Sequence, residues 1–315
     1  MCRVLILVHH QGDRDPIANV LDGMCHLAWS CGDYSQAAAL AEQMLALYGE
    51  LGDLRGRAGA LLHQGTVARE QGAYARACAL LEESLALSRQ LGDSMLTTWT
   101  YTSLGQVALY QGAYARANAA GQAALALFQQ LGGKGEMALM ILGQVALAQG
   151  DSAQAYMLQE ESVRLFRAVA RQGALARALP QLSAAVHAQG DDARAAALLC
   201  EALMLQQQQG NAHRIAESLE GFARLAVAQR GATRAAQLWG AAAALRAISG
   251  APLPPADCVA YDQATATLRA QLDEATFAAA WATGRSLTLE QAIAYALEGS
   301  EMGSVPSTGT AASSQ

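Results

Sequence analysis

The side chains that could carry out chemistry are spread thinly along this sequence. A catalytic site needs a nucleophile, a base or a metal that folding can hold together. Apart from the adjacent pair His9–His10, the histidines lie far apart, at His26, His63, His187 and His213, and no HExxH spacing joins any two of them. Adjacent carboxylates occur at Glu82–Glu83 and Glu160–Glu161, where a hydrated helix face accounts for them. The sequence therefore predicts no catalytic residue, no metal site and no cofactor.

Phosphate binding is also not indicated. The chain contains a single lysine, Lys134, which lies in the short segment Gly132-Gly-Lys-Gly135. A phosphate-binding loop of the GxxxxGK[ST] type needs a longer glycine-rich spacing with a Ser or Thr after the lysine. We interpret this segment as a turn between two helices.

Composition narrows the class of protein further. The 315 residues are 52% hydrophobic and 5% aromatic, with a net charge of −6. The basic residues are scattered, whereas a nucleic-acid-binding protein concentrates them on one face. The six cysteines show no CxxC pair or zinc-ligand spacing, which is typical of reduced thiols in a cytoplasmic protein. No apolar run reaches the length that a membrane span needs. We therefore expect a cytoplasmic protein that binds neither nucleic acid nor membrane.

The elements that must position these residues form an internal repeat. Glycines recur every 20 residues without exception, at Gly12, Gly32, Gly52, Gly72, Gly92, Gly112 and Gly132. The segments between them are rich in alanine and leucine and read as helices, so each repeat contains two helices in about 40 residues. The pattern predicts an all-α, right-handed superhelical solenoid of about six antiparallel helix pairs over residues 1–250.

Local signals indicate how the helices begin and how they pack. An Asp follows the turn in five places and can cap the next helix by accepting from its free N–H groups: Asp33, Asp53, Asp93, Asp151 and Asp191. An alanine five residues after a turn glycine is predicted to let paired helices approach closely: Ala37, Ala77, Ala117, Ala155 and Ala195. Gly173 and Gly231 are predicted to mark two of the later turns.

The two ends of the chain differ from the repeats. Residues 1–11 read as the tail of a helix, so the solenoid starts mid-repeat, and we expect its apolar edge to continue from preceding residues or to contact a partner. Residues 251–298 are predicted to form a C-terminal helical cap of two or three helices after a proline-rich connector. Residues 299–315 are small and polar, which is typical of a disordered tail.

The repeat pattern resembles the tetratricopeptide repeat. The residues that carry this resemblance in the third repeat are Leu104, Gly105, Ala108, Gly112, Tyr114, Ala117 and Ala124. Similar sets occur around Gly72 and Gly150, although the unit here is longer than the usual 34 residues.

The segment after the repeats resembles that of a more specific group of proteins. Residues 250–255, Tyr261, residues 277–293 and Ala296–Leu297 resemble the end of the C-terminal arm of MalT-like, LuxR-type bacterial transcription activators and related signal-transduction ATPases. In that family an ATPase module, and often a DNA-binding helix-turn-helix, accompanies the arm. Neither motif occurs in this chain, so the resemblance implies a sensing or partner-binding arm that could act with an upstream ATPase module.

The resemblance also implies where a ligand would bind. Tetratricopeptide solenoids bind along the concave surface formed by the first helix of each pair. On this chain the corresponding groove positions are Asp22, His26, Trp29, Arg69, Trp99, Thr102, Gln106, Tyr110, Met140, Gln144 and His187. Trp29, Trp99 and Tyr110 are prominent because aromatic residues often anchor interfaces, although packing between helices would also explain them.

The favoured hypothesis is a non-enzymatic scaffold of a bacterial signal-transduction or transcription-regulator system. It would bind a protein segment or a small effector in the concave groove. A stand-alone tetratricopeptide adaptor, with no link to transcription, is the first alternative. An enzyme that uses the groove as its active site is a more distant one. A basic clamp for EEVD-type carboxylate tails is not expected, because it would need several lysines.

Overall fold

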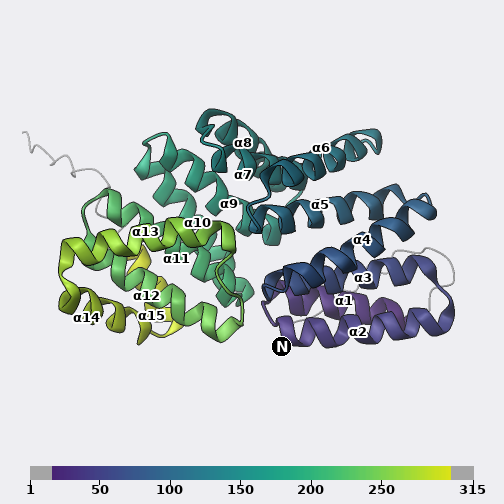
Figure 1. Cartoon of the computed structure of the whole chain (residues 1–315), viewed down its shortest axis with the longest axis horizontal. Helices are drawn as coiled ribbons and strands as arrows, with labels where there is room; N and C mark the ends of the chain where they lie inside the picture. The colour runs from purple at the N-terminus through teal and green to yellow at the C-terminus, as the bar shows by residue number, and fades with distance from the viewer. Residues whose placement is uncertain (1–15, 299–315) are drawn as a thin grey trace, which may run out of the picture.

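The structure is a computed structural model that describes residues 16–298, and this part of the chain is entirely helical (Figure 1). Its first twelve helices form six antiparallel pairs, so the predicted helical-repeat solenoid is confirmed. The pairs are α1 (Pro16–Ser30) with α2 (Tyr34–Leu51), α3 (Leu54–Glu70) with α4 (Tyr74–Gln90), α5 (Ser94–Tyr110) with α6 (Tyr114–Gln130), α7 (Glu136–Ala148) with α8 (Ser152–Ala168), α9 (Gln172–Ala188) with α10 (Asp192–Gln209), and α11 (Ala212–Ala228) with α12 (Ala232–Ser249).

The predicted aspartate caps are present at five helix starts. Each carboxylate accepts a hydrogen bond from the backbone N–H three residues later, at 2.9–3.0 Å, and the capping residues are Asp33, Asp53, Asp93, Asp151 and Asp191. These bonds satisfy donors that the first turn of a helix otherwise leaves free. Most turns also place a glycine in the left-handed conformation; Gly112, for example, has φ = 73°.

Small residues hold the helix pairs together. The five predicted packing alanines are all fully buried. Glycines on the first helices serve the same purpose: a Cβ on Gly65 would lie 2.6 Å from Leu81, and a Cβ on Gly143 would lie 2.8 Å from Gln159. The second helix of each pair can therefore approach the first more closely than larger side chains would allow.

One of the turn predictions is wrong, and another is right in place but not in backbone conformation. Gly173 lies inside α9, and the preceding left-handed turn residue is Ala170, with φ = 51°. The predicted turn at Gly231 lies between α11 and α12, but Arg230, with φ = 60°, takes the left-handed position, whereas Gly231 has φ = −88°. A non-glycine residue in this conformation costs about 1–2 kcal/mol. The packing of the flanking helices therefore overrides the local preference for glycine.

The solenoid closes on itself, which the sequence did not predict. The side chain of Asn211, at the start of α11, donates to the carbonyl of Ser30 at 2.9 Å. Tyr34 Oη and His213 Nδ1 are 2.7 Å apart, and Arg214 Nη2 lies 2.9 Å from Glu70 Oε1. The first, second and sixth pairs therefore meet, and Figure 1 shows α1 to α3 beside the last repeats. We call this set of residues the closing contact: Ser30, Tyr34, Glu70, Asn211, His213 and Arg214.

The residues after α12 form three helices: α13 (Pro255–Leu272), α14 (Glu274–Arg285) and α15 (Leu289–Glu298). Helices α14 and α15 pack against the last repeat, and Phe277 and Ile293 join its apolar core. Helix α13 and its proline-rich connector also reach across the ring to α5, where Ala256 lies beside Gly112. Residues 251–298 therefore contact the interior of the ring as well as its last repeat.

Two sequence-based predictions lie outside the described residues. These are the helix tail at residues 1–11 and the disordered tail at residues 299–315. Within residues 16–298, no helix is both long enough and apolar enough to cross a membrane.

Candidate functional site

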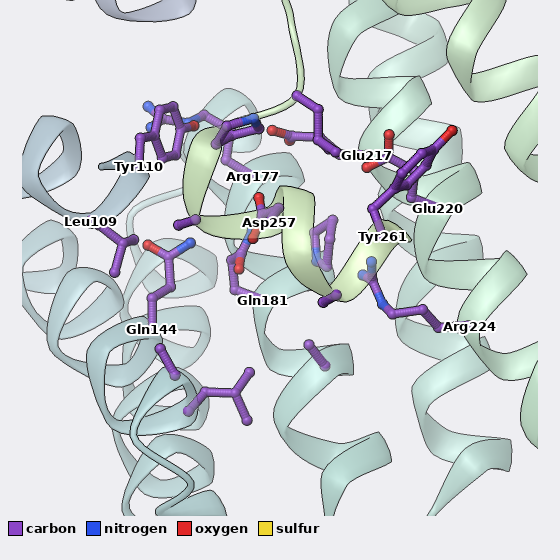
Figure 2. Close-up of a pocket in the computed structure, with 18 of the residues that line it drawn as sticks. Leu109, Tyr110, Gln144, Arg177, Gln181, Glu217, Glu220, Arg224, Asp257 and Tyr261 are labelled. Carbon is purple, nitrogen blue, oxygen red and sulfur yellow. The ribbon is translucent and has the colours of Figure 1, made fainter. Parts of the chain in front are cut away.

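Closure of the ring creates two cavities on its inner side. The first has a volume of about 700 Å³ and is lined by first helices of several pairs, with Trp29, Trp99, Arg69 and Arg177 around it. We call it the arginine cavity. The second has a volume of about 430 Å³ and lies beneath α13 (Figure 2). We call it the cap cavity. Gln106, Arg177 and Arg214 line both, so the two cavities adjoin.

All eleven groove positions predicted from the sequence line these cavities. Seven line the arginine cavity: Asp22, His26, Trp29, Arg69, Trp99, Thr102 and Gln106. Gln106 also lines the cap cavity, together with the remaining four: Tyr110, Met140, Gln144 and His187. Residues from five helix pairs therefore converge on one interior.

The two tryptophans combine packing with exposure to the cavity. Trp99 is partly buried and packs edge-on against Phe128, with ring centroids 5.7 Å apart. The guanidinium of Arg171 lies 5.8 Å from the Trp99 ring centroid, and that of Arg177 lies 5.2 Å from the Trp29 ring centroid. Each indole therefore supports an arginine at the cavity wall through a cation–π contact.

The closing contact contains a buried network of charges. Glu70 has a fully buried side chain and lies 2.5 Å from Arg69 and 2.9 Å from Arg214. Arg214 also lies 2.8 Å from Glu217. Burial alone would raise the pKa of Glu70, but the charges of Arg214 and Arg69 outweigh it and lower the pKa well below its ordinary value. The network therefore depends on Glu70 remaining ionised.

Histidines near the network differ in their protonation. Burial lowers the pKa of His213 to about 4, so this ring is neutral where it meets Tyr34. His63 behaves in the opposite way: burial would lower its pKa, but hydrogen bonds to Asp22 and Cys25 outweigh burial and raise the pKa to about 10. The His63–Asp22 pair, 2.9 Å apart, thus places a matched positive and negative charge at the rim of the arginine cavity.

Arg177, unlike His63, has no carboxylate partner nearby in the described part of the chain. Its Nη2 lies 3.4 Å from the amide oxygen of Gln106, and no carboxylate of the described residues lies within 4.0 Å of it. Burial, together with the like charges of Arg214 and Arg69, lowers the pKa of Arg177 to about 10. This arginine therefore carries a positive charge that the surrounding side chains do not compensate.

In the cap cavity two of the four lining arginines form close ion pairs. Arg246 and Glu220 form a two-point ion pair at 2.6 and 2.9 Å, and Arg214 pairs with Glu217. Figure 2 shows Glu217 and Glu220 beside Tyr261 at the wall of this cavity. Burial raises the pKa of Asp257 on α13 above its ordinary value. The cap cavity also keeps unmet polar groups, because the indole N–H of Trp239 has no acceptor and Arg224 forms no ion pair within the described part of the chain.

The sequence did not single out Glu70, Arg177, Arg214 or Glu217. Glu70 and Arg214 are 144 residues apart, and no local pattern connects them. A weak signal was present in the apolar helix faces, where Arg177 and Arg214 stand among alanine and leucine. Charged residues at otherwise apolar positions are rarely buried without partners, so such positions would be worth examining in other repeats. In the described part of the chain, no cluster of three or more His, Cys, Asp or Glu side chains could hold a metal ion.

Comparison with known proteins agrees with the repeat pattern. Residues 56–130, which span α3 to α6, match the sequence model of the tetratricopeptide repeat family. No curated protein matches the chain. Among solved structures, the chain is similar to BtubC (BKLC) from P. vanneervenii at 17% identity, covering 70% of this chain and 91% of that chain with a TM-score of 0.49. It is also similar to the MamA protein at 18% identity, covering 61% and 93% with a TM-score of 0.36.

Proposed function

We propose that this chain is a non-enzymatic binding scaffold that holds a small effector or a short protein segment inside the closed ring. Tetratricopeptide repeats, matched over residues 56–130, are typical of interaction scaffolds. The proposal assigns binding to the two adjoining cavities and places the protein in the cytoplasm.

One observation carries this proposal. The residues that repeat from pair to pair, such as Ala77 and Ala117, are buried in the joints between helices. The residues that differ from pair to pair, such as Trp29, Trp99 and Tyr110, line the interior of the ring. This separation is expected when the repeats provide a frame and the variable positions recognise a ligand.

The closed shape favours an occupant of limited size. Cavities of about 300–1,000 Å³ are typical of small-molecule sites, and the arginine cavity, at about 700 Å³, lies in that range. Helix α13 reaches across the ring to α5 and reduces the space for a long segment. A small effector or a few residues of a partner would therefore fit better than an extended chain.

The regulatory setting has two candidates. The resemblance of residues 250–297 to MalT-like arms supports a sensing arm that works with an ATPase module. A stand-alone tetratricopeptide adaptor accounts equally well for the repeats and the cavities. An ATPase module encoded next to this chain, and binding to it in a purified mixture, would support the first candidate. A gene with no such neighbour would support the second.

The binding proposal can be tested at Trp99. Trp99→Ala removes a cavity wall, so it should reduce the recovery of bound partners or effectors at least severalfold in comparative pull-downs followed by mass spectrometry. Tyr101→Ala is the matched control, because Tyr101 lies on the same helix and faces Arg89 rather than either cavity. Equal recovery by all three folded proteins would contradict the proposal.

A further inference from the structure

The wall of the arginine cavity carries an excess of positive charge. Four arginines line it, whereas Asp22 is the only carboxylate among residues 16–298 that does so, and Asp22 is already paired with His63. The four are Arg69, Arg171, Arg177 and Arg214. Elsewhere on the protein, arginines such as Arg167 and Arg194 pair with glutamates at 2.5 and 2.7 Å. The excess is also larger here than in the cap cavity, where four arginines accompany three carboxylates.

Carboxylates outside the cavity compensate three of these arginines, and the uncompensated positive charge lies at Arg177. Glu70 lies against Arg69 and Arg214, Glu217 pairs with Arg214, and Glu136 lies 3.8 Å from Arg171. Arg177 has no carboxylate partner among the described residues. Because Arg69, Arg177 and Arg214 face only Glu70 and Glu217, this part of the wall retains a net positive charge.

Two buried hydrogen-bond donors at the same wall have no acceptor. Arg69 is 3% exposed, and its Nε has no hydrogen-bond partner in the described part of the chain. The indole N–H of Trp29, next to Arg177, is also without one. A buried donor left unpaired costs about 1–3 kcal/mol. Both atoms lie just beneath the cavity surface, so the polar wall here is not fully satisfied by the protein itself.

We propose that the arginine cavity binds a small organic anion, a carboxylate or a phosphate, with Arg177 as its principal charge partner. This inference rests on the proposed function and specifies its ligand chemistry. Guanidinium groups recognise carboxylates and phosphates through paired N–H donors. The indoles of Trp29 and Trp99 form the apolar part of the wall, so an anion with a planar apolar body fits better than a bare ion.

The location of the site gives the anion a second effect. Trp29, Arg69 and Arg177 belong to α1, α3 and α9, so one ligand contacts three different repeats. Arg214, from α11, lies at the same wall and belongs to the closing contact. Binding therefore stabilises the closed ring, because a ligand that binds only the folded form shifts the folding equilibrium towards it.

Calorimetric titration of the purified chain tests this inference. The probes are benzene-1,3,5-tricarboxylate and pyrophosphate, which distinguish carboxylate from phosphate recognition, with neutral benzamide for comparison. We expect at least one anion to bind, to raise the melting temperature, and to bind more weakly at higher NaCl concentration, with benzamide binding at least tenfold more weakly. Absence of binding by both anions would overturn the inference.

Two variants locate the site. Arg177→Gln should weaken anion binding at least tenfold, and its ligand-free melting temperature should stay the same or rise because an uncompensated charge is removed. Arg116→Gln, an arginine with a side chain 63% exposed on α6, should bind as wild type. Equal affinity in the two variants would overturn the assignment. If Trp99→Ala still abolished partner recovery while no anion bound, the binding scaffold would stand and only its anionic ligand would be rejected.

Discussion

The ring is held by two kinds of contact that differ in chemistry. The joints between successive helices are apolar and close, as at Ala117, which belongs to one cluster with Ala108 and Val145. The closing contact joins the second and sixth pairs through a fully buried carboxylate, Glu70, and the guanidinium of Arg214. The joints are repeated along the chain, whereas the closing contact occurs once and depends on residues that no other repeat shares.

The joints therefore account for most of the stability of the solenoid, whereas the closing contact determines that it is closed. A solenoid of joints alone gains free energy from each pair of neighbours and can remain open. A buried ion pair contributes little net stability compared with apolar packing, but breaking it leaves a charge without a partner. The closing contact therefore selects the closed arrangement, which brings residues of the first, second and sixth pairs around the arginine cavity.

The largest effect is expected at Glu70. Glu70→Ala leaves Arg69 and Arg214 buried without their shared carboxylate, which should lower the free energy of unfolding by about 3–5 kcal/mol. Urea denaturation followed by circular dichroism measures this change. The control is Glu83→Ala, which removes an ion pair whose two side chains are each 45% exposed and should cost less than about 1 kcal/mol. Similar losses in both variants would show that breaking the closing contact costs no more than breaking an exposed ion pair.

A joint should respond to overpacking by a smaller amount. Ala117 is fully buried between helices, so Ala117→Leu should lower the free energy of unfolding by about 1–3 kcal/mol. Ala119→Leu, at an exposed position on the same helix, should leave stability nearly unchanged. Thermal and urea denaturation measure both variants. If Ala117→Leu cost no more than Ala119→Leu, the packing described for the joints would be wrong.

The closing contact should also respond to pH in a way that the joints do not. Unfolded histidine binds a proton below about pH 6.5, whereas folded His213 stays neutral until about pH 4. Wild type therefore loses stability at this site as the pH falls from 6.5 towards 4. His213→Asn cannot titrate, so the stability cost of this substitution should shrink by about 2 kcal/mol between pH 8 and pH 5.

His63 provides the opposite control. Its folded pKa of about 10 lies above the unfolded value, so its contribution is fully present below pH 6.5 and is lost as the pH rises towards 10. The cost of His63→Asn should therefore grow, not shrink, between pH 8 and pH 5. Urea denaturation at a series of pH values measures both variants against wild type. Parallel pH profiles for the two variants would contradict the assigned protonation states.

The sequence predicted the joints well because their causes are local. Asp93 caps a helix that begins at the next residue, and Ala117 repeats a position that recurs every 40 residues. The turns at Ala170 and Arg230 could not be predicted in this way, because tertiary packing imposes their backbone conformation. The closing contact could not be predicted either, because the ion pair of Glu70 and Arg214 depends on how far the whole solenoid curves. The sequence indicated which residues line the interior, but not that the interior is enclosed.

A double-mutant cycle on Glu70 and Arg214 tests the closed ring most directly. The cycle compares the free energy of unfolding of wild type, Glu70→Gln, Arg214→Gln and the double variant by urea denaturation. Because the two side chains are in contact across the ring, we expect a coupling energy of about 1–3 kcal/mol. In an open solenoid, residues of the second and sixth repeats would be independent. Effects that add to within about 0.5 kcal/mol would therefore contradict closure of the ring.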